Sequence, residues 1–499
     1  MIFLVVSAVL TALSMPGFLL GILVWFSLVF LFKSLENKGP FFGALYGFLF
    51  YYIFCVINLF WVLPVLTENL PKVFGRFPSW LGFFVFLLMC AIEALPFAGF
   101  GLIYGFMERF IKTNPYKEIL FTASLYTLFD YLRGIGQMGF TGGTLSDALY
   151  KDVGILQLAS IIGPYGLTFL IVAFNCWLYI NWRRSLKPLE KLIFYVLIVI
   201  AISHVVAAFL PFPVTSEKAI VSVQTNVKQD EKYSTDAFTL AQRYLDLVLG
   251  FQDLLVVFPE ETFTNDIRGG AVERLFVDTA RETNLKFLIG FPTFEGDGYK
   301  NSAVLLSSAG VVDQYSKVIL FPFVEMLPYP RFFRVFGFLR GLEYLKPGQD
   351  FKPLVLPDYP PLGVQICFES YFSKPSRELV KNGAEVLLVC TNDGWFAYNV
   401  ALKQHFAKAV MRAVENRRQV IQVSNAGITG MIDPYGRILK IVPLRKELAA
   451  KFELIPNDTV TIYCRIGDVI IWLCVGILIV VLLLPRRQYV KSERRIFLR

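Results

Sequence analysis

The sequence predicts a two-part fold, in which a bundle of membrane-spanning helices carries a water-facing α/β domain. Of 499 residues, 55% are hydrophobic and only 17% are charged, whereas soluble chains average about 25% charged residues. The apolar residues gather in 1–212 and 466–484, while 215–465 alternates strand-like and helix-like segments with charges throughout. We therefore expect N-terminal transmembrane helices over 1–212, a water-facing α/β domain over 215–465, and a last helix with a basic tail over 466–499.

Eight apolar stretches are candidate membrane spans, because a hydrocarbon layer of ~30 Å requires about 20 apolar residues in a helix. The first two are short and are separated only by Met15-Pro16-Gly17. The first stretch lacks a preceding basic segment and is followed by further spans, so it is not expected to be a signal peptide. The eight stretches are 2–14, 17–32, 43–64, 80–106, 118–133, 158–180, 192–211 and 467–484.

The net charge of +9 is explained by its position along the chain. If the N-terminus is cytoplasmic, the inner segments and the tail after Pro485 carry fifteen lysines and arginines, whereas the short outer loops carry only Lys72, Arg76 and Lys151. The positive-inside rule then predicts that both termini are cytoplasmic and that 215–465 lies on the outer face. The basic excess is a topology signal, and nucleic-acid binding is not expected.

The cysteines and histidines argue against a metal site. Seven cysteines include no CxxC pair and only two histidines are present, so neither a zinc ribbon nor a His-rich centre is predicted. Glu93 lies inside the fourth span, where a carboxylate is either hydrogen-bonded to a neighbouring helix or functional. Both explanations stay open.

The segment 215–465 reads as alternating strands and helices, which is typical of a layered α/β sheet. Strands are expected at 219–223, 254–258, 287–290, 303–306, 362–366, 386–390 and 420–423, and helices at 239–250, 271–283, 376–382 and 404–416.

Three segments of this domain place a reactive group at or after a strand: Pro259-Glu260, Tyr315-Ser316-Lys317 and Ile366-Cys367. A thiolate is a strong nucleophile, and it forms when a base or a positive charge lies nearby. A glutamate can take the thiol proton, and a lysine can stabilise the oxyanion that forms when a carbonyl is attacked. Spacing alone does not show that the three groups converge.

The motifs resemble those of the nitrilase superfamily, and the whole chain is similar to its membrane-bound branch, the apolipoprotein N-acyltransferases. A soluble nitrilase would share the Glu-Lys-Cys set but not the spans or the Pro322-Phe323-x-Glu325 element. The other matching segments are Cys367-Phe368-Glu369, Asn392-Asp393-x-Trp395-Phe396, Gln404-His405-Phe406, Met411-Arg412-Ala413, Asn425-x-Gly427-Ile428-Thr429, Leu132-Arg133-Gly134 and Gln157 with Gly163.

The resemblance implies an α-β-β-α sandwich that uses neither a cofactor nor a metal. It makes Glu260 the general base, Lys317 the oxyanion stabiliser and Cys367 the nucleophile. Glu261 is the fallback base, and since neighbours on a strand point to opposite faces, only one of the pair is expected to face the pocket. The supporting residues implied are Glu325, Glu369, Asn301 and Phe368, and the candidate substrate-binding residues are Trp395, Phe396 and Arg133.

The sequence departs from the family pattern at three places. Val324 stands where glycine is usual, Phe368 stands where tyrosine is usual, and Thr141-Gly142 replaces a Pro-Trp pair. The departures at Val324 and Phe368 affect the flexibility of the lid and one hydrogen bond near the thiol. The departure at Thr141-Gly142 affects contacts with lipid or with the acceptor.

The function implied is acyl transfer from a membrane phospholipid, through a cysteine thioester, to the α-amine of the diacylglyceryl-cysteine at an apolipoprotein N-terminus. The enzyme is expected to be a monomer in the bacterial cytoplasmic (inner) membrane, with its catalytic domain on the periplasmic face. One alternative is a membrane-tethered amidase that uses the same residues with water as the acceptor. A transporter with an accessory domain is a second alternative, which the scarcity of ionisable residues in the spans disfavours.

Overall fold

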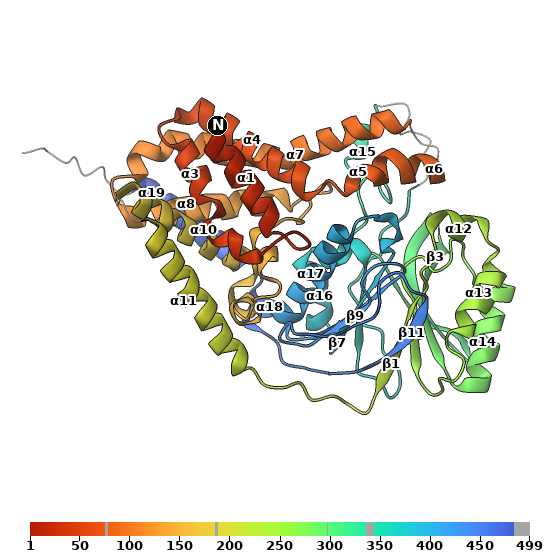
Figure 1. Cartoon of the computed structure of the whole chain (residues 1–499). Helices are drawn as coiled ribbons and strands as arrows, with labels where there is room; N and C mark the ends of the chain where they lie inside the picture. Colours follow the sequence, from red (N-terminus) through yellow and green to blue (C-terminus); the bar gives the residue numbers. More distant parts are fainter. Residues whose placement is uncertain (75–77, 185–187, 297, 336–343, 484–499) are drawn as a thin grey trace, which may run out of the picture.

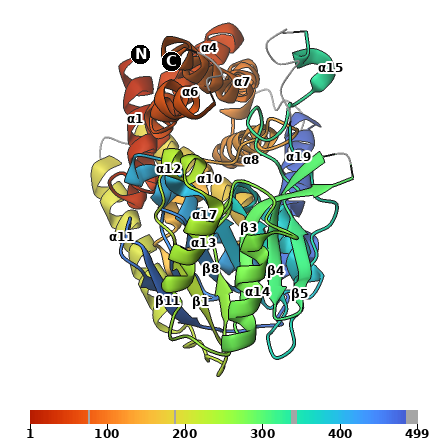
Figure 2. The same ribbon diagram turned by 90° about the vertical axis from the view of Figure 1, so that its right-hand side faces the viewer.

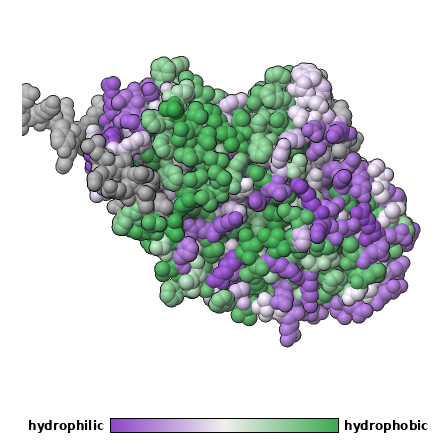
Figure 3. All heavy atoms as spheres, in the orientation of Figure 1, coloured by the Kyte–Doolittle hydropathy of each residue, from purple (hydrophilic) through white to green (hydrophobic). Residues whose placement is uncertain are grey.

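The computed structural model describes residues 1–74, 78–184, 188–296, 298–335 and 344–483. Helices from the N-terminal half gather on one side of the molecule, and the strands gather on the other (Figure 1). Hydrophobic residues dominate the surface over the helices, whereas hydrophilic residues dominate the surface over the strands (Figure 3). The basic tail predicted after Pro485 lies outside the described residues.

The N-terminal half contains long helices joined by short helical turns. Its long helices α4 and α7 pack so closely that a Cβ added to Gly47 would lie 2.1 Å from the Phe97 carbonyl oxygen, and one added to Gly101 would lie 2.0 Å from that of Gly43. Glycines four residues apart let the two backbones touch, as small residues do between helices in membranes. The helices and turns are α1 (Ile2–Ser14), η1 (Gly21–Leu23), α2 (Val24–Ser27), α3 (Val29–Leu35), α4 (Gly39–Asn58), α5 (Val62–Pro64), η2 (Val65–Asn69), α6 (Leu70–Phe74), α7 (Ser79–Ile111), α8 (Pro115–Arg133), η3 (Leu145–Leu149), α9 (Val153–Leu156), α10 (Ala159–Arg184) and α11 (Pro188–Ala208).

Within the described residues, three helices are long and apolar enough to cross a membrane: α4, α7 and α10. Four shorter apolar helical segments cover Ile2–Ser14, Gly21–Leu35, Leu197–Ala208 and Val469–Leu483. The predicted span at 118–133 corresponds to α8, which is a helix but does not belong to either group. The described residues thus support a helical membrane part, and the number of eight spans stays a prediction.

The C-terminal half contains two sheets. The first has the strand order β11-β1-β2-β3-β4-β5, with β1, β2 and β3 parallel, and the second has the order β10-β9-β8-β7-β6, with β6, β7 and β8 parallel. The strands are β1 (Ala219–Gln224), β2 (Leu255–Val257), β3 (Lys286–Glu295), β4 (Gly298–Ser307), β5 (Gly310–Ser316), β6 (Leu362–Ile366), β7 (Val386–Thr391), β8 (Gln419–Ser424), β9 (Gly430–Ile432), β10 (Ile438–Ile441) and β11 (Leu448–Glu453).

Helices cover the outer face of each sheet, so the domain is an α-β-β-α sandwich (Figures 1 and 2). Alternate residues of β2 show the layering: Val256 packs in a core with the helices α13 and α14, while Leu255 and Val257 belong to the core that includes the second sheet. This alternation follows from the two-residue period of a strand. The helices of the domain are α12 (Gln229–Ser234), α13 (Ala237–Asp246), α14 (Ala271–Thr283), α15 (Pro330–Phe333), α16 (Ser373–Lys381), α17 (Asn399–Asn416) and α18 (Ile462–Ile466), followed by α19 (Val469–Leu483).

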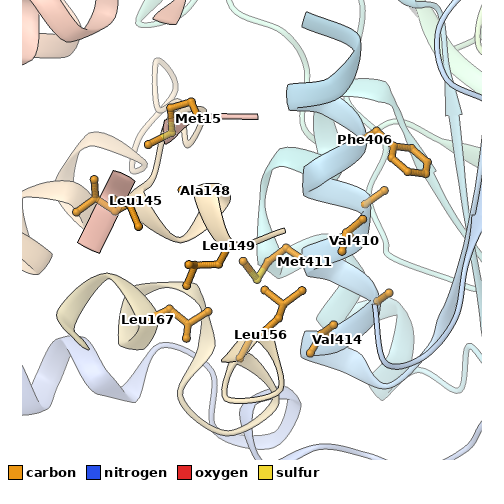
Figure 4. Close-up of a cluster of buried hydrophobic side chains, with 14 of the residues drawn as sticks. Met15, Leu145, Ala148, Leu149, Leu156, Leu167, Phe406, Val410, Met411 and Val414 are labelled. Atoms are coloured by element: carbon orange, nitrogen blue, oxygen red, sulfur yellow. The ribbon is translucent and has the colours of Figure 1, made fainter. Parts of the chain in front are cut away.

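Helix α17 joins the sandwich to the N-terminal half. Lys408 donates to the Thr141 carbonyl (2.6 Å) and to Asp147 (2.8 Å), and Trp61 donates to Gln404 (3.0 Å). A buried apolar cluster between the two halves accompanies these bonds (Figure 4). It includes Met15, Leu145, Ala148, Leu149, Leu156 and Leu167 from the N-terminal half and Phe406, Val410, Met411 and Val414 from α17.

Candidate active site

Lys317 lies in a buried cluster of charged side chains at the carboxyl end of the parallel strands. Its Nζ is 3.0 Å from Glu260 Oε1 and 2.9 Å from Glu325 Oε1, and only 2% of its side chain is exposed. Asn301 on β4 donates its side-chain amide to both carboxylates, at 2.9 Å to Glu260 and 2.8 Å to Glu325. One ammonium and one amide thus hold together two carboxylates that would otherwise repel each other. We call Glu260, Lys317, Glu325 and Asn301 the charged cluster.

Cys367 begins the turn that follows β6 and is half-buried. Its backbone has a φ of 47°, in the left-handed region that costs a non-glycine residue on the order of 1–3 kcal/mol. The charges of Glu260 and Lys317 both act on its thiol, and the Glu369 side chain binds backbone N–H groups next to Lys317 and next to Cys367. The structure therefore brings together the carboxylate, the ammonium and the thiol that are distant in the sequence.

The charges set opposite proton affinities on these groups. Burial would lower the pKa of Lys317, but Glu260 and Glu325 raise it well above its usual value. Burial would raise the pKa of Glu260, but the Lys317 charge and the N–H groups of Asn392 and Asn301 hold it below its usual value. Burial and the Glu260 charge raise the pKa of the Cys367 thiol well above its usual value, against the opposing effect of Lys317. The resting site thus pairs the Glu260 carboxylate and the Lys317 ammonium with a neutral Cys367 thiol.

Glu369 does not point into the charged cluster but fastens the backbone around it. Its Oε1 accepts the N–H groups of Val318 (2.7 Å) and Ile319 (3.2 Å), its Oε2 accepts that of Ile366 (2.8 Å), and the Tyr315 hydroxyl donates to both oxygens. The residue is fully buried. Because these donors flank Lys317 on one side and Cys367 on the other, one carboxylate fixes the two segments relative to each other.

Glu261 lies outside the charged cluster, but the predicted strand alternation is not the reason. Strand β2 ends at Val257, and Glu261 sits in a turn with a φ of 53°. Both glutamates contact Asn392, whose backbone N–H donates to Glu260 (3.0 Å) and whose side chain donates to Glu261 (2.7 Å). Only Glu260 also contacts Lys317.

The remaining candidates occupy the surroundings of the site. Phe368 is buried, and its ring contacts that of Phe321 with centroids 4.7 Å apart. Trp395 and Phe396 are half-buried and dock on the N-terminal half, since Asn69 donates to the Trp395 carbonyl (2.7 Å) and Phe396 packs edge-on against Trp61. These two aromatic residues therefore belong to the junction between the two halves.

The structure does not bring Arg133 to the charged cluster. The Arg133 guanidinium is buried in the helix bundle, where it pairs with Asp130 (3.0 Å) and Glu93 (3.3 Å) and donates to the Phe140 and Gly142 carbonyls. All of its hydrogen-bond partners within the described residues lie in the N-terminal half. Glu93, whose role the sequence leaves open, is thus paired with a neighbouring helix.

The sequence matches Asn392, Asp393 and His405 to the family pattern but assigns them no place in the site, and the structure puts all three in its surroundings. The first two follow β7, which pairs in parallel with β6, so the carboxyl ends of the two strands meet at the same sheet edge. That adjacency is the signal that could have placed Asn392 near Cys367. Within the described residues, no group of three or more His, Cys, Asp or Glu side chains is arranged to hold a metal ion.

Comparisons with known proteins agree with this two-part organisation. The sequence profile of the apolipoprotein N-acyltransferase N-terminal domain matches residues 7–177, and that of carbon-nitrogen hydrolases matches residues 223–452. The apolipoprotein N-acyltransferase of Thermotoga maritima is 45% identical over 98% of this chain and 94% of its own length. That of Geobacter metallireducens is 29% identical over 98% of this chain and 96% of its own length.

Among solved structures, Nit3 of Saccharomyces cerevisiae, a member of branch 10 of the nitrilase superfamily, covers 55% of this chain and 97% of its own, with 18% identity and a TM-score of 0.36. The nearly full-length match at 45% identity identifies the family. The chain belongs to the apolipoprotein N-acyltransferases.

Proposed function

We propose that the chain transfers an acyl group from a membrane phospholipid to the α-amine of the diacylglyceryl-cysteine at the N-terminus of an apolipoprotein. The observation that carries this proposal is the buried contact of Glu260 with Lys317 beside the Cys367 thiol. A base, a fixed cation and a thiol are the parts that nucleophilic acyl transfer needs. Family membership selects the substrates.

In the first half-reaction, Glu260 takes the Sγ proton and the thiolate attacks the ester carbonyl carbon of the phospholipid. The Lys317 ammonium donates to the oxyanion that forms. When the tetrahedral intermediate collapses, the C–O bond breaks, the lysophospholipid alkoxide takes the proton back from Glu260, and the acyl group remains on Cys367 as a thioester.

In the second half-reaction, the free α-amine of the acceptor attacks the thioester carbonyl. The C–S bond breaks as the amide C–N bond forms, and the amine proton passes by way of Glu260 to the leaving thiolate. Each half-reaction thus regenerates the ionised Glu260, and the cycle is of the ping-pong type.

The charges of the resting site support general-base catalysis rather than a preformed thiolate. Glu260 has a lowered pKa and Cys367 a raised one, so the proton rests on sulfur until substrate arrives. Lys317 keeps its charge between two carboxylates, which supports its assignment to the oxyanion. Glu325 contacts that ammonium directly, and Asn301 donates to both of the carboxylates that hold it.

The membrane half has a physical purpose in this proposal. Both substrates are anchored by acyl chains, so their reactive groups stay near the membrane surface, and the sandwich must be held there. We propose that the chain crosses the membrane eight times and consists of three regions, 1–212, 215–465 and 466–499. We also propose that the aromatic pair Trp395-Phe396 contacts substrate at the junction of the halves. We further propose that the enzyme is a monomer.

The arrangement of the loops supports an outer location for the sandwich and cytoplasmic termini in the inner membrane. The segments predicted to be cytoplasmic contact one another, as Glu108 accepts from the Asn37 N–H (2.8 Å) and Arg183 pairs with Glu118 (2.8 Å). The loops predicted to be outside contact the sandwich instead, as Thr141 donates to the Tyr371 carbonyl (2.7 Å).

The test uses the full chain in phospholipid vesicles with a synthetic lipopeptide that carries an N-terminal diacylglyceryl-cysteine. With phospholipid alone, intact-protein mass spectrometry is expected to show one acyl group on Cys367. Added lipopeptide should remove that group and gain an amide-linked acyl chain. Cys367→Ala should show neither product.

Two outcomes would overturn the proposal. If Cys367→Ala still acylates the lipopeptide, the nucleophile is another residue. If the wild-type protein leaves the lipopeptide unchanged but hydrolyses simple amides, the chain is a membrane-tethered amidase. Cys464→Ala is the matched control, because that buried thiol lies on α18 and should leave both products unchanged.

A further inference from the structure

His405 lies directly against the backbone of the candidate nucleophile. It sits on α17 with a fully buried ring, and its Nδ1 is 2.8 Å from Asp393 Oδ1. Its other nitrogen, Nε2, is 2.8 Å from the Ser370 hydroxyl oxygen and 3.2 Å from the Cys367 carbonyl oxygen. The Ser370 hydroxyl is in turn 2.8 Å from the same carbonyl oxygen. Three polar atoms therefore form a closed triangle beneath Cys367.

Counting protons in this triangle determines the state of the ring. The carbonyl oxygen has no proton to give, so its contacts need donors from Ser370 and His405. If the Ser370 hydroxyl donates to the carbonyl, Nε2 must carry a proton to bond the Ser370 oxygen. If the hydroxyl instead donates to Nε2, the Cys367 carbonyl oxygen faces a nitrogen lone pair at 3.2 Å and keeps only the backbone N–H donor of its own 3-10 turn. A protonated Nε2, shared between the Ser370 oxygen and the Cys367 carbonyl oxygen, satisfies all three contacts.

The second nitrogen is also a donor, because Asp393 Oδ1 is an acceptor. That aspartate is fully buried, and its oxygens also accept hydrogen bonds from Thr391 (3.0 Å) and Ser424 (3.1 Å). A ring that donates from both nitrogens is an imidazolium. The buried ion pair with Asp393 compensates its charge.

We propose that His405 is a positioning residue, held as an imidazolium by Asp393, whose Nε2–H fixes the Cys367 carbonyl and with it the left-handed turn that presents the thiol. This inference rests on the proposed function of Cys367. It adds to that function a buried cation that acts through the nucleophile's backbone rather than on the substrate.

The charges that face the ring come from every element around it. Asp393 follows β7, Glu260 follows β2, Cys367 and the stacked Tyr371 ring come from the turn after β6, and Lys408 lies one turn along α17. Burial lowers the pKa of His405, but Asp393, the Cys367 carbonyl and Glu260 outweigh burial and raise it above its usual value.

A pH dependence follows from this arrangement. As the pH rises through the raised pKa of His405, the ring keeps its proton on Nδ1 toward Asp393 and loses the one on Nε2. The Cys367 carbonyl then loses that donor, and acylation of Cys367 is expected to slow at high pH. A non-titrating donor at the same place should remove this basic limb.

The first experiment reads the ring itself. The chain has two histidines, and His204 is exposed on α11, so His204→Asn leaves one ¹⁵N-labelled histidine in the full-length protein. Nitrogen NMR in detergent is expected to show both His405 nitrogens protonated at pH 7 and titration above pH 6.5. A neutral ring at pH 7, with an unprotonated Nε2, would overturn the proposal even if the protein is fully active.

The second experiment follows the rate of acyl-adduct formation on Cys367 from pH 6 to 9. His405→Gln keeps an N–H donor without titrating, so we expect it to lose about tenfold in rate at pH 7, the equivalent of one hydrogen bond, and to show no basic limb. Asp393→Asn removes the ion-pair partner, so the basic limb should move about one to three pH units lower.

The two experiments separate the proposals. If the adduct forms on another residue, the proposed function fails whatever the NMR shows. If the adduct forms on Cys367 but His405→Gln and Asp393→Asn keep the wild-type pH profile, only the role of His405 is wrong. Circular dichroism shows whether each variant still folds. If a variant does not fold, the nitrogen NMR spectrum of the unaltered His405 ring decides whether the proposal holds.

Discussion

Glu260 and Glu261 are chemically identical neighbours that differ in their surroundings. Glu260 contacts the buried ammonium of Lys317, whereas Glu261 accepts from the half-exposed Tyr233 hydroxyl (2.9 Å). Burial and the adjacent Glu260 charge raise the pKa of Glu261, against the effect of the Lys232 charge. The pKa of Glu260 is lowered. A general base must be ionised at neutral pH to take the thiol proton. The surroundings of Glu260 favour the ionised form, and those of Glu261 oppose it.

We predict that Glu260→Gln slows acyl-adduct formation on Cys367 by about 10²–10⁴-fold, because the general base is removed. The matched variant Glu261→Gln should slow it by less than about tenfold, because its carboxylate lies outside the charged cluster. The initial rate of adduct formation with phospholipid, followed by intact-protein mass, measures both. A larger loss in Glu261→Gln than in Glu260→Gln would exchange the two assignments.

At this scale the sequence predicts the reactive groups but not their partners. Cys367, Glu260 and Lys317 can be named because each stands in a recognisable motif. Asn392 and His405 also stand in matching motifs, but the motifs do not give their contacts, since these depend on which strand ends meet and on which face of α17 turns inward. The triangle of Ser370, His405 and the Cys367 carbonyl involves atoms that spacing along the chain does not relate.

At the scale of elements, Glu369 joins the end of β5 to the end of β6. Its two oxygens accept backbone N–H groups from the segments that carry Lys317 and Cys367. Strand pairing ends close to this point: the last pair of β5 is Ser302 with Ser316, the last pair of β6 is Ile366 with Cys390, and the Lys317 N–H still donates to the Asn301 carbonyl (2.8 Å). The carboxylate therefore adds a link between the two strand ends and supports the strained turn at Cys367.

We predict that Glu369→Gln destabilises the protein by about 1–3 kcal/mol, because an amide has one oxygen where several donors converge and leaves a buried N–H without an acceptor. Thermal unfolding in detergent measures this, and acylation of Cys367 should slow in parallel. The control is Glu378→Gln on α16, whose partly exposed carboxylate pairs with Lys381 and should have little effect. Equal unfolding temperatures for the two variants would contradict the fastening role.

The effect of Glu369→Gln should also depend on pH. Burial raises the pKa of Glu369 to about 7, against the opposing effect of the N–H donors. Between about pH 4.5 and pH 7 the folded protein therefore binds a proton that the unfolded chain releases, so unfolding becomes easier as the pH rises. Since glutamine does not titrate, the stability advantage of the wild type over Glu369→Gln should be larger at pH 5 than at pH 8.

Burial determines which elements the sequence predicts. The segments expected at 362–366 and 271–283 coincide with β6 and α14, because continuous apolar runs and a helical apolar period are strong signals. Strands β5 and β10 were not expected, because most of their residues are exposed or half-exposed and do not form an apolar run. Helix α17 was expected only from 404, although it begins at Asn399 and Leu402 continues the apolar spacing of Phe406 and Val410.

At the scale of the whole molecule, composition predicts two halves but not how they join. The junction is formed by α17, which the sequence presents as an ordinary domain helix. Lys408 would be expected to face water, yet its ammonium is buried against Asp147 and the Thr141 carbonyl of the N-terminal half. The same helix carries His405 one turn earlier, so the element that docks on the membrane part also contacts the candidate nucleophile.

We predict that breaking the Lys408–Asp147 pair from either side weakens the junction strongly. Removing one partner of a buried pair costs about 3–5 kcal/mol, because the remaining charge is left without compensation. Burial lowers the pKa of Lys408 and Asp147 opposes this, so Asp147→Asn should destabilise the buried ammonium further. Asp147→Asn and Lys408→Met should each lower the unfolding temperature by roughly 5 °C or more.

The double variant decides whether the pair acts as a unit. When both charges are removed, the desolvation cost disappears together with the attraction, so Asp147→Asn/Lys408→Met should lose less than the sum of the single variants. Lys381→Met, at a partly exposed pair on α16, is the control and should stay within about 1 kcal/mol of the wild type. Strict additivity would mean that Lys408 and Asp147 stabilise the protein independently. A coupled loss that also slows acylation of Cys367 would show that α17 transmits the docking of the membrane half to the site, because Lys408 touches no residue of the charged cluster among its described hydrogen bonds.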